Sequence, residues 1–297
     1  MLVLDNLTKI FDHTPAVNAL SLQIEEGVVF GLLGPNGAGK TTTIRMIMQI
    51  LQPDSGRILL DGAAIARPDL RNFGYLPEER GLYPKAKIRE AIQYFAGLKG
   101  MSSQTAKRRI DELLERFELQ DGGDRRIEEL SKGNQQKIQF IIAIVHEPKI
   151  LILDEPFAGL DPVNQLLLKE IILEMKERNT TILFSTHQME QVEKLCERIC
   201  LIHNGGSVLY GDLDDIRGRY GNRTIEVHYS GDQQELEQLP LKYLRLTRKM
   251  FLAELGPDAS LDDILGELIR TVRVTHFSIL EPSLEQIFID QVKGGAL

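Results

Sequence analysis

The sequence predicts an α/β domain built on a parallel sheet, followed by a smaller α+β domain. Two continuous apolar runs, residues 28–33 and 150–153, are typical of parallel strands that are buried on both faces. Strand-like runs alternate with amphipathic helical patterns from Leu2 to about Tyr210, which is the order of an α/β domain. After about Asp212 the pattern changes to period-two alternation, as in residues 224–229.

The first domain is assigned to residues 1–212. Its strands are expected at residues 28–33, 150–153, 181–184 and 199–202. A helix through Ile44, Ile47 and Leu51 is expected to follow the first of these strands. Apolar residues at helical spacing within residues 88–95 and 110–117 predict a helical insert, and we place a helical subdomain at about 85–145. Asn204-Gly205 predicts a hairpin turn.

The second domain is assigned to residues 213–297, in the approximate order β-α-β-β-α-β-α. Strands are expected near residues 224–229, 244–246, 251–255 and 272–274, with a helix at 261–269. Ser283 and Gln286 form a capping-box pattern that predicts the start of a last helix.

Composition excludes several classes of protein. The 297 residues carry a net charge of −8, which counts against a chain whose main partner is nucleic acid. No run of about 18 apolar residues could span a bilayer, and no basic start followed by an apolar run marks a signal peptide. The two cysteines, Cys196 and Cys200, are expected to be small buried apolar residues.

The strongest motif is the segment from Gly34 to Thr41, which matches G-x-x-x-x-G-K-[ST] between a strand and a helix. Its glycines let backbone N–H groups surround phosphate oxygens, and the helix N-terminus adds positive charge. We expect Lys40 to reach the β- and γ-phosphates and Thr41 to hold Mg²⁺. The alternative, a chance glycine-rich turn, is weakened by the context.

Two further segments end predicted strands with polar residues. Asp154 and Glu155 follow residues 150–153, at the carboxyl edge where open α/β sheets bind ligands. We expect Asp154 to support Mg²⁺ and Glu155 to orient the attacking water. His187 follows residues 181–184 and is placed near the γ-phosphate. Each segment alone also fits a structural role, as an acidic strand end or a solvent-facing histidine.

A fourth segment, Leu130 to Asn134, precedes an amphipathic helix with Ser131 as its expected N-cap. Lys132 is unusual there, because a cation in the first helical turn opposes the helix dipole by roughly 0.3–1 kcal/mol. We therefore expect Ser131 and Lys132 to meet a triphosphate.

Together, in this order, the four segments resemble the ATPase subunit of an ABC transporter, over about Leu2 to Tyr210. The resemblance implies a P-loop NTPase fold, ATP and Mg²⁺ as cofactors, and catalysis by Glu155, His187 and Lys40. It implies that Phe11 stacks on adenine near Val17. The nucleotide contacts that it implies are Phe11, Val17, Gly34, Asn36, Gly37, Ala38, Gly39, Lys40, Thr41, Thr42, Ser131 and Gly133.

The resemblance also implies partners. Ser131 and Gly133 belong to the signature motif, which contacts ATP on the opposite subunit, so a homodimer or a closely related heterodimer is expected. Gly159 to Pro162 matches a loop that crosses the dimer interface, although Asp161 as an N-cap before Pro162 explains that pair locally. A separate integral membrane permease is implied, so the chain is expected at the cytoplasmic face of the cell membrane.

Three residues depart from the common family pattern: Glu78 replaces Gln, Lys132 replaces Gly and Asn134 replaces Gln. Glu78 remains a hard oxygen ligand for Mg²⁺, so the metal residues are Thr41, Asp154 and Glu78. Residues 75–83 and 130–134 resemble the bacterial exporter branch of the sodium-extrusion (NatA-like) ATPases. The tail Glu281 to Phe288 resembles, more weakly, the accessory domain common in that branch.

Two other functions stay open from the sequence: a soluble ABC ATPase acting on DNA or ribosomes, and a regulatory subunit that binds ATP without hydrolysing it. The second domain fits either a dimer-stabilising appendage or a ligand-sensing module.

Overall fold

The computed structural model describes residues 1–79, 81–220, 224–231, 236, 239, 241–256, 260–280 and 283–294. The chain divides into two compact units, residues 1–213 and 214–297. Within the described ranges, no helix is both long enough and apolar enough to cross a membrane.

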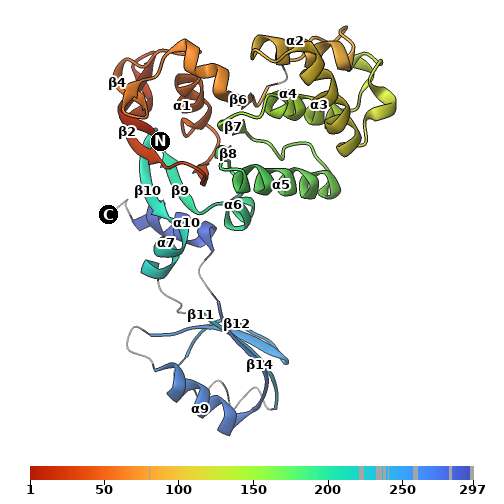
Figure 1. Ribbon diagram of the computed structural model, residues 1–297. Helices are drawn as coiled ribbons and strands as arrows, with labels where there is room; N and C mark the ends of the chain where they lie inside the picture. The colour runs from red at the N-terminus through yellow and green to blue at the C-terminus, as the bar shows by residue number, and fades with distance from the viewer. Residues whose placement is uncertain are drawn as a thin grey trace. The chain divides into compact units, whose positions relative to one another are not determined.

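The first unit contains a six-stranded sheet with the strand order β10-β9-β3-β8-β7-β6 (Figure 1). Its strands are β3 (Val29–Leu33), β6 (Phe73–Leu76), β7 (Ile150–Asp154), β8 (Thr181–Thr186), β9 (Arg198–His203) and β10 (Gly206–Asp212). All neighbours are parallel except β10, which pairs antiparallel with β9. Every residue of β3, β7 and β8 is buried, which explains their continuous apolar runs. The four expected strands are confirmed.

The hairpin turn between β9 and β10 is also confirmed. Asn204 and Gly205 both have positive φ, 49° and 77°, and His203 pairs with Gly206. Two successive positive φ angles are the requirement of the tight hairpin turn that Asn-Gly favours.

A second sheet in this unit was not predicted. It is antiparallel, in the order β2-β1-β4-β5, and consists of β1 (Leu2–Phe11), β2 (Thr14–Ile24), β4 (Ser55–Leu60) and β5 (Ala63–Ala64). The β1–β2 pairing shifts register at three places. Each shift interrupts the alternation of side chains between the two faces, so the period-two signal in the sequence is weak.

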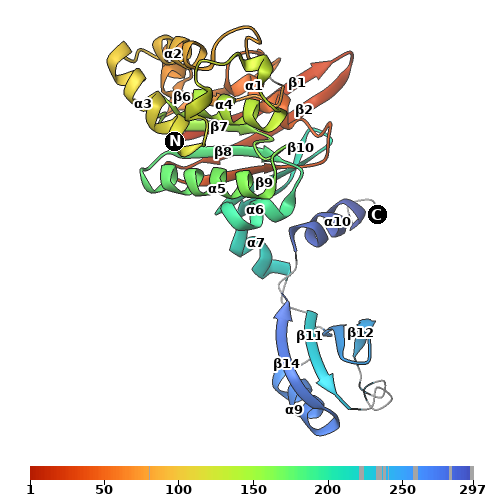
Figure 2. The same ribbon diagram turned by 90° about the vertical axis from the view of Figure 1, so that its right-hand side faces the viewer.

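Three helices cover the six-stranded sheet: α1 (Lys40–Ile47), α5 (Pro162–Glu177) and α6 (Met189–Leu195). Figure 2 shows α1 on one side of the sheet and α5 and α6 on the other. The expectation that the first helix continues to Leu51 was wrong. Gln49 takes a left-handed φ of 54°, and the backbone N–H groups of Ile50 and Leu51 both donate to the Arg45 carbonyl, which ends the helix.

The helical insert lies between β6 and β7, and Figure 1 shows it as a group of helices in gold to yellow-green. It consists of α2 (Ile88–Leu98), α3 (Ser103–Arg116) and α4 (Lys132–Ile144), with short 3₁₀ turns η2 (Gln120–Gly122) and η3 (Ile127–Glu129). A further turn, η1 (Arg67–Asn72), precedes β6. The rings of Phe117 and Phe140 pack 6.0 Å apart between α3 and α4, so the insert has apolar packing of its own. The helices expected around residues 88–95 and 110–117 are confirmed.

The second unit is a four-stranded antiparallel sheet in the order β12-β13-β11-β14. Its strands are β11 (Thr224–Ser230), β12 (Lys242–Leu246), β13 (Met250–Glu254) and β14 (Arg273–Leu280), and its helices are α9 (Leu261–Thr271) and α10 (Leu284–Gly294). The helix α7 (Leu213–Tyr220) spans the boundary between the units. Alternate residues of β11 and β13 pack with Leu268 of α9 in one apolar core.

Further expectations for this unit concern its last helix and the helix between its first two strands. Ser283 caps the last helix, because its Oγ accepts a hydrogen bond of 3.2 Å from the Gln286 N–H. The helix expected between the first two strands falls on residues of which only 231, 236, 239 and 241 are described. Glu281 and Pro282 of the tail also lie outside the described residues.

Candidate nucleotide-binding site

A glycine-rich loop connects the end of β3 at Leu33 to the start of α1 at Lys40. Gly34 and Gly39 have φ angles of 152° and 107°, in the region that favours glycine. A Cβ atom on Gly34 would lie 2.3 Å from the Ile202 carbonyl oxygen, and one on Gly39 would lie 2.3 Å from the Ala16 carbonyl oxygen. Neighbouring backbone therefore leaves room only for glycine at both positions.

The loop borders a cavity of about 180 Å³, below the usual range for whole drug-sized ligands. Its lining residues are Ala16, Asn36, Gly37, Gly39, Lys40, Thr41, Thr42, Glu78 and Glu155. Ala38 is buried behind the loop, and its carbonyl accepts a 3.1 Å hydrogen bond from the Gly205 N–H. The volume is suited to the phosphate end of a nucleotide.

Lys40 is the buried cation of this cavity, with a relative exposure of 6%. Its Nζ donates hydrogen bonds to the carbonyl oxygens of Gly34 at 2.8 Å and Pro35 at 3.2 Å, and lies 4.0 Å from Glu155 Oε1. Burial lowers the pKa of Lys40, while the nearby carboxylates of Glu155, Asp154 and Glu78 act in the opposite direction.

Asp154 ends β7 and is fully buried. Its Oδ1 accepts a hydrogen bond from Ser185 Oγ, whereas its Oδ2 is buried without a hydrogen-bond partner among the described residues. Burial first, and then the charges of Glu78 and Glu155, raise the pKa of Asp154. A buried, unpartnered carboxylate oxygen costs free energy, and a cation would satisfy it.

The donor set near Asp154 fits Mg²⁺ bound together with a nucleotide. Thr41 Oγ1 donates to Glu78 Oε2 at 3.3 Å, so hydroxyl and carboxylate oxygens, the hard ligands that Mg²⁺ prefers, gather beside the loop. Across the described ranges, no group of three or more His, Cys, Asp or Glu residues is arranged to hold a metal. Mg²⁺ ordinarily takes one or two protein ligands and completes its shell with phosphate and water, which matches this arrangement.

Glu155 follows Asp154 with a left-handed backbone, φ 49°, which is strained for a residue with a side chain. Its Oε1 accepts hydrogen bonds from His187 Nδ1 at 2.8 Å and the His187 N–H at 3.1 Å, and its Oε2 accepts one from Thr186 Oγ1 at 3.2 Å. β8 lies between β3 and β7, so the end of β8 brings His187 to this carboxylate. The structure thus holds Glu155 at the cavity wall in one orientation.

Two residues assigned to the adenine lie away from the cavity lining. Phe11 ends β1, is 47% exposed, and has Lys9 Nζ 5.5 Å from its ring centroid. Val17 is fully buried in the core, whereas the adjacent Ala16 lines the cavity. The sequence pattern did not single out Ala16, since a small residue in a strand carries no signal of its own.

Ser131 and Gly133 lie at the N-terminus of α4 and are not among the residues that line this cavity. Ser131 is exposed and caps the helix, with its Oγ accepting from the Asn134 N–H at 3.3 Å. Lys132 follows it and is also exposed. The local interpretation of Asp161 is confirmed as well: it caps α5 by accepting from the Asn164 N–H at 3.0 Å.

Comparisons with known proteins agree with this geometry. The family described as ABC transporter matches residues 17–158, and the family described as ATP-binding protein DrrA1-3-like, C-terminal domain, matches residues 211–292. An uncharacterised ABC transporter ATP-binding protein of Bacillus subtilis, YhaQ, is 44% identical over 294 residues, 98% of each chain. The ABC transporter ATP-binding protein NatA of the same organism is 40% identical over 205 residues, 68% of this chain and 83% of that one.

A solved structure titled as the ATP binding subunit of an ABC transporter superposes with a TM-score of 0.70 at 33% identity. The match covers 74% of this chain and 93% of that chain.

Proposed function

This chain belongs to the family of ABC transporter ATP-binding proteins, and we propose that it drives a separate membrane permease by closing as a dimer around Mg²⁺-ATP. The family assignment makes it an ATP-binding ATPase. The dimer, the metal, the residue roles and the direction of transport are parts of the proposal.

The observation that carries the proposal is the held carboxylate of Glu155, 4.0 Å from the buried ammonium of Lys40. Lys40 binds the phosphate oxygens on which negative charge develops during phosphoryl transfer. Glu155 accepts a hydrogen bond from the attacking water and orients it. His187 keeps the carboxylate in that orientation. Thr41 and Asp154 would hold Mg²⁺, which would neutralise charge on the phosphate oxygens. Glu78, whose Oε2 accepts a hydrogen bond from Thr41 Oγ1, would be a further ligand.

The second subunit completes the site. Ser131 and Gly133 form an exposed or half-buried helix N-terminus, whose N–H groups and positive dipole end suit an anion. In a dimer this terminus would meet the triphosphate held by the other chain. Lys132 adds a positive charge at the same place. Hydrolysis then depends on two copies of this chain, or on this chain and a close relative.

The permease is proposed to dock beside residues 78–83. An apolar cavity of about 280 Å³ lies there, with Tyr75, Leu82 and Phe95 in its lining. Tyr83 is 58% exposed and Tyr94 is 54% exposed, and such aromatic side chains are common at protein interfaces. Docking there would place the chain at the cytoplasmic face of the membrane. Export is the proposed direction, supported by the resemblance of residues 75–83 and 130–134 to the exporter branch.

The test compares Glu155→Gln with Glu177→Gln, an exposed glutamate at the end of α5. We expect Glu155→Gln to bind ATP with near-normal affinity, to lose turnover by about 10²–10⁴-fold, and to accumulate as a dimer with ATP. Glu177→Gln should behave as the parent. Retained turnover in Glu155→Gln would refute the assigned role, and a parent protein without turnover would favour the regulatory alternative.

A further inference from the structure

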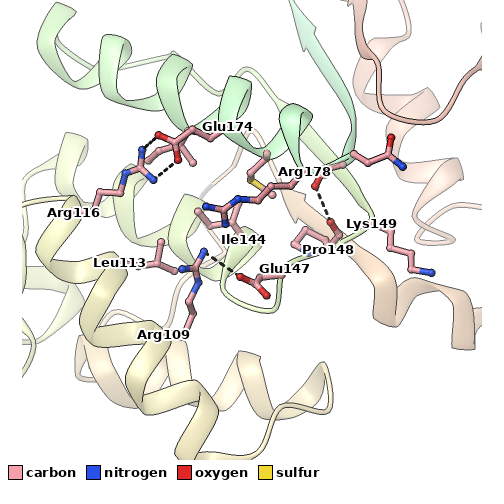
Figure 3. Close-up of a pocket in the computed structure, with 13 residues that line it drawn as sticks. Arg109, Leu113, Arg116, Ile144, Glu147, Pro148, Lys149, Glu174 and Arg178 are labelled. Atoms are coloured by element: carbon pink, nitrogen blue, oxygen red, sulfur yellow. Dashed lines mark hydrogen bonds and ion pairs between the residues drawn. The ribbon is translucent and has the colours of Figure 1, made fainter.

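A second cavity, outside the nucleotide site, lies where the helical insert meets the core of the first unit (Figure 3). Its volume is about 260 Å³. Three segments form its wall: α3, the connection from α4 to β7, and the end of α5 with the turn that follows. No residue of this cavity takes part in the proposed ATPase mechanism.

The polar wall of this cavity is rich in arginine. Arg109 and Arg116 come from α3 and Arg178 from the end of α5, against the two carboxylates of Glu147 and Glu174. Figure 3 shows Arg109 and Arg116 extending from α3 and Arg178 extending from the end of α5 toward them. The apolar part of the lining includes Leu113, Ile144, Ile171 and Met175.

Three carboxylates, Glu112, Glu147 and Glu174, pair with Arg109 and Arg116, and Arg178 is left without an ion pair among the described residues. Glu174 accepts a bidentate pair from Arg116, with one bond of 2.6 Å, and this pairing, together with the charge of Arg178, lowers the pKa of Glu174. Arg109 donates from Nη1 to Glu112 Oε2 at 3.0 Å, and its Nη2 lies 3.5 Å from Glu147 Oε1. The Nε of Arg109 is buried without a hydrogen-bond partner among the described residues. Arg178 is exposed, and its guanidinium makes no hydrogen bond or ion pair with any residue that the structure describes, although its charge acts on Glu174.

We propose that this cavity binds a small amphipathic anion, with a phosphate or carboxylate group on the guanidinium groups of Arg178 and Arg109 and an apolar body against Leu113 and Met175. Guanidinium groups bind such anions through paired hydrogen bonds, and planar arginine is better suited to this than lysine. The volume admits a chain of a few carbon atoms beside the charged group. Because the wall joins α3 to α5, the bound anion links the helical insert to the core.

The experiment uses the full chain saturated with Mg²⁺ and a non-hydrolysable ATP analogue, which fills the γ-phosphate position, so that the glycine-rich loop does not compete for phosphate. Calorimetric titrations compare hexyl phosphate, inorganic phosphate and hexanol. We expect hexyl phosphate to bind at least about tenfold more tightly than inorganic phosphate, because burial of two methylene groups alone accounts for that factor. Hexanol should not bind. Equal affinities for the two phosphates would assign the site to free phosphate and refute the apolar part.

Variants locate the site. Arg178→Gln should weaken hexyl phosphate binding by about tenfold or more, and Arg109→Gln should do the same. Arg108→Gln is the matched control on α3, since the Arg108 side chain is 78% exposed and does not line the cavity. Hexyl phosphate should also raise the melting temperature of the parent more than that of Arg178→Gln. An unchanged affinity in Arg178→Gln, or no binding to the parent, would overturn the proposal.

Discussion

Replacing His187 by alanine tests how the structure orients Glu155. The imidazole donates the shortest of the three hydrogen bonds to that carboxylate, 2.8 Å, and the bonds from the His187 N–H and Thr186 Oγ1 survive the substitution. A hydrogen bond to a charged group contributes about 1.5–3 kcal/mol. Because the His187 side chain is 49% exposed, we take the lower value, and about 1.5 kcal/mol corresponds to a loss of roughly tenfold in kcat.

The assay is steady-state ATP turnover at several ATP concentrations, with His276→Ala, an exposed histidine of the second unit, as the control. We expect a fall in kcat with little change in KM, because His187 does not line the cavity beside the glycine-rich loop. If His187 acts only through Glu155, adding His187→Ala to Glu155→Gln should cause no further loss. A further tenfold loss in the double variant would show that His187 acts directly on the nucleotide.

Three more predictions concern charge. Lys132→Ala should raise the KM for ATP by about three- to tenfold, and unchanged kinetics would refute the role of Lys132. The same substitution should raise the free energy of unfolding by up to about 1 kcal/mol, because the exposed Lys132 opposes the dipole of its own helix. Glu78→Gln should tighten binding of Mg²⁺-free ATP by about three- to tenfold in a fluorescent-nucleotide titration with chelator, since it removes one negative charge beside Thr41; weaker binding would contradict this. Burial, together with the charge of Lys99, lowers the pKa of His146 to about 4 in the folded chain. As the pH falls below 6.5, His146 is therefore protonated in the unfolded chain before it is protonated in the folded chain. The free energy of unfolding should therefore fall by up to about 3 kcal/mol between pH 6.5 and pH 4, and His146→Gln should reduce that slope in denaturant titrations.

Local sequence patterns were sufficient to predict the strands and the helix N-caps that position the proposed site residues. The strands before Gly34, Asp154 and His187 are buried on both faces, so their apolar runs are unbroken and visible without any tertiary information. Ser131 and Asp161 could be identified as N-caps for the same reason, because a cap depends on three or four neighbouring residues.

Contacts between distant segments could not be predicted in this way. The antiparallel sheet of β1, β2, β4 and β5 depends on pairing with register shifts, which a period-two count does not detect. The end of α1 depends on Gln49 adopting a left-handed backbone, which carries little signal in a residue other than glycine or asparagine. Ala16 lines the cavity whereas the adjacent Val17 is buried in the core, because strand register decides which of two adjacent residues faces the cavity.

The Lys40 ammonium has a thermodynamic consequence for nucleotide binding. Its Nζ already donates to the carbonyl oxygens of Gly34 and Pro35, so the loop holds its shape through its own side chain. In the proposed mechanism, triphosphate binding is an exchange: the Lys40 ammonium leaves the two carbonyl oxygens and donates to phosphate oxygens instead. The measured binding enthalpy will therefore understate the ammonium–phosphate attraction.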